Sequence, residues 1–162
     1  PGTGGQKTWD KYIIYLIMII WLFWIIIIPL DAKRFGWSPE FPLWIKLISI
    51  ALLLVSFYFF FNAFRDNTYL SPLVRVQSER KQTVISKGVY GIVRHPMYLG
   101  AVLLFIASPM LMSSIAGIII GLLMTLLLTV RIIGEEKMLI EELEGYDEYK
   151  NKVKFRLIPF IW

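Results

Sequence analysis

The sequence of 162 residues has no cysteine and a single histidine, His95. Without cysteine the chain has no disulfides, no thiolate metal sites and no cysteine nucleophiles, and one histidine argues against a histidine-based metal site. Charged residues are also scarce, at 18% of the chain. We therefore expect no metal centre and a site built from few ionisable groups.

Apolar residues are abundant instead. They make up 57% of the chain, and the mean hydropathy is +0.63. This composition is too apolar for an ordinary soluble protein and indicates an integral membrane protein of one domain. In such a protein the net charge of +5 reflects topology and contact with anionic membrane lipids, so we expect no nucleic-acid partner.

Long apolar runs indicate where the chain crosses the membrane. Residues 12–30 and 42–64 each form an apolar run of about 20 residues, enough for a helix to cross a bilayer core of about 30 Å. Residues 97–131 have no charge before Arg131 and suffice for two more spans that turn near residues 109–114. The predicted fold is all-α, a polytopic membrane protein with about four transmembrane helices.

The remaining segments divide the chain into three parts. Residues 1–11 form a tail whose first residues lack an initiator methionine and are interpreted as an expression remnant, and residues 12–64 form two transmembrane helices. Residues 65–162 form the functional core: a loop, a transmembrane hairpin and C-terminal helices. Residues 31–41 are expected to be a loop.

The polar segment 65–95 contains two stretches rich in β-forming residues, 73–77 and 82–85, on either side of a polar turn at 78–81. This pattern predicts a short β-hairpin on the membrane surface.

A row of small residues follows the turn of the hairpin, with members spaced four apart. Small residues let helices approach closely in lipid, and a spacing of four lets only two or three members face one partner. We assign the row to packing: Ser113, Gly117, Gly121, Thr125 and Thr129.

The distribution of lysine and arginine predicts the orientation. Two precede the first span, six lie in residues 65–95 and six in residues 131–162, against two in residues 31–41. Because positive residues favour the cytoplasmic side, both termini and His95 are predicted to face the cytoplasm.

The segment 88–100 gathers Tyr90, Arg94, His95 and Tyr98 immediately before the third span. Pro96 is tolerated in a first helical turn, so His95 is expected at the start of that helix, where N–H groups are free. The fourth span ends near Glu135, and the open ends of a helical hairpin meet. We therefore predict a bipolar pocket that binds an amino acid head group.

In this pocket Arg94 and His95 would bind the carboxylate, and Glu135 and Glu136 the ammonium. Simpler interpretations remain open. The two acids also suit a solvated helix start, and Arg94 and Arg131 also suit anchors whose charges reach the interface. Aromatic residues near the C-terminus are interpreted as interfacial anchors: Tyr146, Tyr149 and Trp162.

Four motifs in order resemble the isoprenylcysteine carboxyl methyltransferase family, which includes phospholipid methyltransferases, and its prokaryotic members in particular. They are Gly-Val-Tyr-Gly-Ile-Val-Arg-His-Pro-Met-Tyr at 88–98, Arg131-x-x-x-Glu135-Glu136, Gly145-Tyr146-x-x-Tyr149, and Arg-Leu-Ile-Pro at 156–159. The resemblance covers residues 67–162. It implies S-adenosylmethionine as methyl donor, bound by Tyr90, Arg94, His95, Tyr98, Glu135 and Glu136.

The resemblance also places Arg131 near the acceptor, where it would orient a carboxylate, whereas Glu135 would take a proton from an amine. We therefore expect a methyltransferase acting on a lipid-borne or small hydrophobic acceptor, either an isoprenylcysteine carboxylate or a phospholipid amine. The alternatives are a sterol-reductase-like membrane enzyme that uses NADPH and a non-catalytic helical bundle that binds lipid or a partner. The sequence leaves the acceptor and the oligomeric state open.

Overall fold

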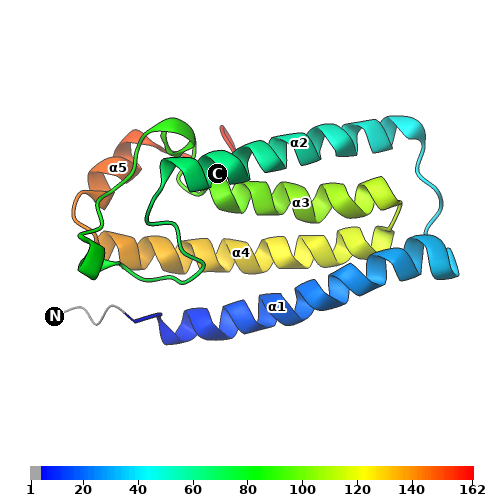
Figure 1. Cartoon of the computed structure of the whole chain (residues 1–162), viewed down its shortest axis with the longest axis horizontal. Coiled ribbons are helices and arrows are strands. Elements are labelled where there is room, and N and C mark those ends of the chain that lie inside the picture. Colours follow the sequence, from blue (N-terminus) through cyan, green and yellow to red (C-terminus); the bar gives the residue numbers. More distant parts are fainter. Residues whose placement is uncertain (1–4) are drawn as a thin grey trace.

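Four long helices lie side by side along the longest axis of the computed structural model, which describes residues 5–162 (Figure 1). A short fifth helix, α5, covers one end, and the described residues contain no strand. The all-α prediction is confirmed, while residues 1–4 of the predicted expression remnant lie outside the described residues. The helices are α1 (Thr8–Pro29), α2 (Leu43–Asp66), α3 (Pro96–Met112), α4 (Ile115–Glu142) and α5 (Tyr146–Lys152).

Three of these helices are long and apolar enough to cross a membrane: α1 with its extension to Phe35, α2 and α4. The fourth, α3, has 17 residues, which corresponds to about 25 Å and lies at the lower limit for a span. The chain is therefore a polytopic membrane protein, as its composition predicted.

The first helix does not end where the sequence predicted. The expected loop at 31–41 is wrong in its first half, because α1 continues into a π-helical segment, Leu30–Phe35, and Gly36 then turns the chain at a φ of 63°. The buried carboxylate of Asp31 explains the extension. Its Oδ2 atom accepts hydrogen bonds from the hydroxyls of Ser38 and Ser114, both at 2.7 Å, and so ties α1 to the α3–α4 turn.

The turn between α3 and α4 lies at Ser113 and Ser114, within the predicted region. Ser114 is the N-cap of α4, and its hydroxyl oxygen accepts a hydrogen bond from the Gly117 N–H at 2.9 Å. Serine is a favoured N-cap because this bond satisfies one of the free N–H groups of a helix start.

Helix α3 packs between α2 and α4, and α1 packs on α4. A Cβ atom on Gly121 would lie 2.3 Å from the backbone oxygen of Phe105, and one on Gly117 would lie 2.6 Å from the Cβ of Pro109. Two members of the predicted small-residue row thus let α4 approach α3 closely, and the packing prediction is confirmed.

The α1–α2 connection and the α3–α4 turn lie at one end of the bundle, and the segment 67–95, α5 and the start of α1 lie at the other (Figure 1). The β-hairpin predicted in this segment is wrong, since only 3₁₀ turns occur there, Ser78–Arg80 and Gly88–Gly91. The N–H of Val74 donates to the carboxylate of Asp10, and the N–H of Gln77 to the side chain of Gln82. These backbone donors are therefore satisfied without a neighbouring strand.

Candidate functional site

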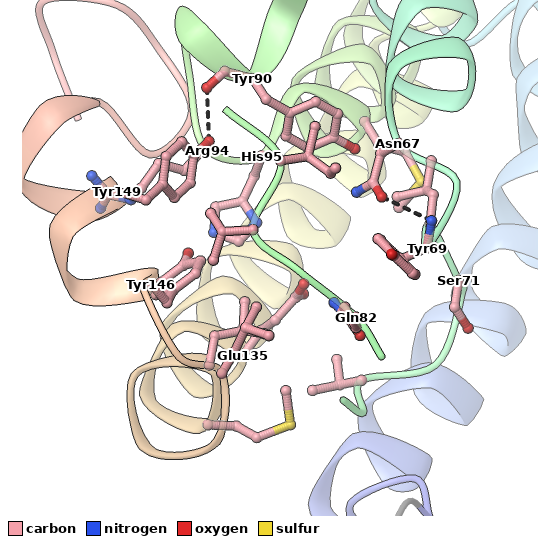
Figure 2. A pocket seen from close by; sticks show the side chains of 18 of the residues that line it. Asn67, Tyr69, Ser71, Gln82, Tyr90, Arg94, His95, Glu135, Tyr146 and Tyr149 are labelled. Atoms are coloured by element: carbon pink, nitrogen blue, oxygen red, sulfur yellow. Dashed lines mark hydrogen bonds between the residues drawn. The ribbon is translucent and has the colours of Figure 1, made fainter. Parts of the chain in front are cut away.

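A cavity lies at the end of the bundle where the segment after α2, the start of α3, the last third of α4 and α5 meet (Figure 2). The loop before the third span and the C-terminal helices form its walls, as the sequence predicted. Its polar and aromatic lining consists of Asn67, Tyr69, Ser71, Gln82, Tyr90, Arg94, His95, Tyr98, Glu135, Tyr146 and Tyr149, with Arg75 and Thr83.

His95 is the N-cap of α3 and Pro96 begins the helix, as predicted. The backbone N–H groups of Arg94 and His95 donate to the carbonyls of Phe155 and Arg156, both at 2.9 Å. The segment 153–156, after α5, therefore lies alongside the start of α3 and fixes the direction in which the Arg94 and His95 side chains leave the backbone.

The buried carboxylate of Glu136 holds three basic side chains together. Its Oε1 atom accepts from Arg94 Nε at 2.5 Å and lies 3.3 Å from His95 Nε2, and its Oε2 atom accepts from Arg156 Nε at 2.7 Å. Arg94 also donates to the carbonyls of Val153 and Lys154. The groups that the sequence assigned to opposite ends of a ligand thus pair with each other, and Glu136 does not line the cavity.

Glu135, the neighbour of Glu136, is the acid among the described lining residues. Its Oε2 atom accepts a hydrogen bond from the Tyr98 hydroxyl at 2.7 Å, and the Tyr98 ring stacks on the His95 ring with centroids 5.5 Å apart. The two adjacent acids point different ways, as expected from a helix. Glu135 therefore offers its carboxylate to the cavity, and Glu136 does not.

Arg131 lies one turn before Glu135 but outside the cavity lining. Its Nε donates to Asp10 Oδ1 at 2.7 Å, and its guanidinium lies 5.6 Å from the centroid of the Tyr98 ring. Both partners of this ion pair are buried, with 5% of Arg131 and 0% of Asp10 exposed. The structure thus places Arg131 beside the cavity, paired with an acid that belongs to none of the sequence motifs.

Three buried tyrosines form another wall. Tyr149 donates to the backbone oxygen of Tyr90 at 2.8 Å, and the Tyr90 hydroxyl interacts with the Asn67 side chain, whereas the hydroxyl of Tyr146 is buried without a hydrogen-bond partner among the described residues. Burial raises the pKa of Tyr90 to about 12 and raises the pKa of Tyr146 and Tyr149 well above the usual value, so all three remain neutral donors. An unpaired buried hydroxyl is costly, and a ligand that accepted from Tyr146 would remove this cost.

Several residues that line the cavity were not predicted from the sequence or were predicted to have another role. Tyr146 and Tyr149 were interpreted as interfacial anchors, but both are buried and line the cavity. Asn67, Tyr69, Ser71 and Gln82, which form the wall after α2 (Figure 2), lie in a segment without periodicity. For the tyrosines the motif Gly-Tyr-x-x-Tyr was a usable signal, since it places both rings on one turn of a helix.

The arrangement suits a small molecule that carries positive charge and hydrogen-bond acceptors. The cavity offers tyrosine faces, which attract cations, one carboxylate, and the buried hydroxyls of Tyr90 and Tyr146. Among residues 5–162 no three acidic or histidine side chains cluster as metal ligands would.

The model of the isoprenylcysteine carboxyl methyltransferase (ICMT) family matches residues 49–141, more than half of the chain. The match starts within α2 and ends in α4, so it includes the segment 67–95 and both arms of the α3–α4 hairpin. No curated protein matches the chain.

Proposed function

Because the chain belongs to the isoprenylcysteine carboxyl methyltransferase family and is thus an integral-membrane methyltransferase, we propose that it uses S-adenosylmethionine to methylate a lipid-borne or small hydrophobic acceptor. The observation that carries this proposal is the composition of the cavity. It combines the carboxylate of Glu135 with stacked aromatic faces and with the buried hydroxyls of Tyr90 and Tyr146.

These groups fit the donor part by part. Glu135 would accept hydrogen bonds from its ammonium, and the faces of Tyr90 and Tyr98 would attract its sulfonium. Arg94 and His95, which both line the cavity, would face its carboxylate. Glu136 would not contact the donor, but it would hold the Arg94 and His95 side chains in place.

When bound, the donor supplies an electrophilic methyl group, so the chain needs no covalent nucleophile. Its own residues align the two reactants and exclude water. The wall formed by residues 67–85 covers the cavity on the side away from α4 and α5 and is suited to exclude water.

The two candidate catalytic residues differ in how they are placed. Glu135 lines the cavity and would take a proton from an amine acceptor. Arg131 would orient a carboxylate acceptor, which would share the guanidinium with Asp10. Isoprenylcysteine-like carboxylates and phospholipid amines therefore both remain within the proposal.

Ligand binding tests the choice of cofactor. S-adenosylhomocysteine is expected to raise the unfolding temperature of the detergent-solubilised protein, whereas NADPH is not, since a ligand of the folded state stabilises it. Stabilisation by NADPH alone would favour the sterol-reductase-like alternative, and no response to either ligand would favour the non-catalytic bundle. Mass spectrometry of membrane extracts incubated with isotope-labelled S-adenosylmethionine would then identify the acceptor.

We also propose that the cavity faces the cytoplasm, on the basis of the lysine and arginine distribution. Because the chain has no native cysteine, single cysteines give unambiguous labelling. Cysteines at the exposed positions Ser86 and Lys152 should react with an impermeant maleimide from the cytoplasmic side, and one at Glu40 from the opposite side. Labelling of Glu40→Cys and Ser86→Cys from the same side would contradict the proposed topology.

A further inference from the structure

The first turn of α1 carries a carboxylate that is fully enclosed by groups from the cavity end of the bundle. Asp10 is 0% exposed. Its Oδ1 atom accepts from Arg131 Nε at 2.7 Å, and its Oδ2 atom accepts from Arg131 Nη2 at 3.3 Å, from the Val74 N–H at 3.0 Å and from Gln6 at 2.9 Å. One side chain of α1 thus binds both α4 and the wall that follows α2.

Two partners of Asp10, Val74 and Arg131, connect it to the lining of the cavity. Val74 is itself a lining residue. Arg131 lies over the ring of Tyr98, and Tyr98 donates its hydroxyl to Glu135 at 2.7 Å. Arg131 also donates to the backbone oxygen of Pro72, in the same wall. Asp10 does not line the cavity, so any effect it has on a ligand passes through these residues.

Residues next to Asp10 at the start of α1 make further contacts with the cavity end of the bundle. A Cβ atom on Gly134, the residue before Glu135, would lie 2.6 Å from the Trp9 ring. The glycine therefore leaves room for the indole to pack on α4. The N–H of Lys7 donates to the Val74 backbone oxygen at 3.4 Å, and the Lys7 ammonium pairs with Glu142. Three of residues 7–10, which are the N-cap and first three residues of α1, therefore contact the cavity end of the bundle.

We propose that Asp10 is a positioning residue of the cofactor site, an assignment that rests on the proposed function in that the bound ligand is S-adenosylmethionine. The Asp10 carboxylate neutralises Arg131 behind Tyr98 and Glu135, and it anchors the wall at Val74. Without the carboxylate, Arg131 is a buried cation without its ion-pair partner and is drawn toward Glu135, the nearest acid on its own helix face. The wall also loses the charge-assisted hydrogen bond that the Val74 N–H donates to Asp10.

The same helix provides a matched control. Asp31, in the π-helical extension of α1, is also 0% exposed and accepts hydrogen bonds from Ser38, Ser114 and the Ala116 N–H. It lies at the opposite end of the bundle, about 30 Å away along the helix. Asp31→Asn therefore removes a buried charge of the same kind without touching the cavity.

The test compares Asp10→Asn, Asp10→Glu and Asp31→Asn in the full chain in detergent, with two measurements. Hydrogen exchange of the peptide that covers residues 70–76, without ligand, is expected to be about tenfold faster in Asp10→Asn. The dissociation constant of the Asp10→Asn protein for S-adenosylhomocysteine is expected to rise about tenfold. Asp31→Asn is expected to stay within about twofold of the parent in both measurements, even where its unfolding temperature falls.

Asp10→Glu keeps the charge and is expected to lie between the parent and Asp10→Asn in both measurements. A Glu variant no better than the Asn variant overturns the assignment to the carboxylate. Equal changes in Asp10→Asn and Asp31→Asn, or faster exchange in Asp10→Asn without loss of affinity, overturn the positioning role. If the parent itself fails to bind S-adenosylhomocysteine, the proposed function fails, while the exchange measurement still decides whether Asp10 anchors the wall.

Discussion

Glu136→Gln is expected to lower the free energy of unfolding by about 3–5 kcal/mol, the cost of removing one partner from a buried ion pair. The carboxylate is 3% exposed and binds Arg94, His95 and Arg156 at once. The isosteric amide has one acceptor oxygen, and its NH₂ group would face a guanidinium. The buried guanidinium of Arg94 would therefore be left without its ion-pair partner.

Thermal unfolding in detergent would measure this effect. For a chain of this size, the expected loss corresponds to a fall of roughly 6–20 °C in the unfolding temperature. Glu144→Gln, at an exposed position just beyond the same helix, is the control and should change the temperature little. A Glu136→Gln protein as stable as the control would mean that the Arg94, His95 and Arg156 cluster is held together by other contacts.

Glu135→Gln is expected to weaken S-adenosylhomocysteine binding roughly tenfold or more without a comparable loss of stability. Glu135 lines the cavity (Figure 2), and in the structure its carboxylate accepts only the Tyr98 hydroxyl among the described side chains. A charge-assisted hydrogen bond to a ligand ammonium contributes about 1.5–3 kcal/mol, and each 1.4 kcal/mol is a factor of ten in affinity.

Glu141 provides the comparison for this effect, because it lies on the same helix, about 9 Å further along the axis, and is exposed. Solvent and salt screen it, so Glu141→Gln should change the affinity by well under tenfold. Paired calorimetric titrations of Glu135→Gln and Glu141→Gln with S-adenosylhomocysteine measure the two losses of affinity. Comparable losses in both would mean that Glu135 acts only through the overall charge of the helix and does not contact the ligand.

The features that sequence predicted correctly are those set by neighbouring residues. Apolar runs and their lengths indicated the helices, and the predicted turn region, residues 109–114, contains the observed turn between α3 and α4. His95 was placed at a helix start because Pro96 follows it, and the structure has it at the N-cap. The resemblance to the family also rested on local motifs, and the family match confirms it.

The features that sequence missed depend on residues far apart in the chain. The stretch around Val74 has the composition of a strand, but its N–H binds Asp10, 64 residues away. No local pattern reveals that Arg131 pairs with Asp10 or that Glu136 gathers Arg94 and Arg156. For the cavity, sequence therefore indicated most of the ionisable residues, and the structure assigns their partners.

The ion pair between Asp10 and Arg131 also bears on how the chain enters the bilayer. Asp10 lies in the first turn of α1, and Arg131 lies 16 residues after the start of α4, about 24 Å along it. Both charges therefore lie near the same membrane surface, where an unpaired charge costs far less than at the bilayer centre. We therefore expect each helix to insert on its own and the pair to form when α1 associates with α4. Completion of the cavity wall is thereby expected to depend on helix association, the second stage of membrane-protein folding.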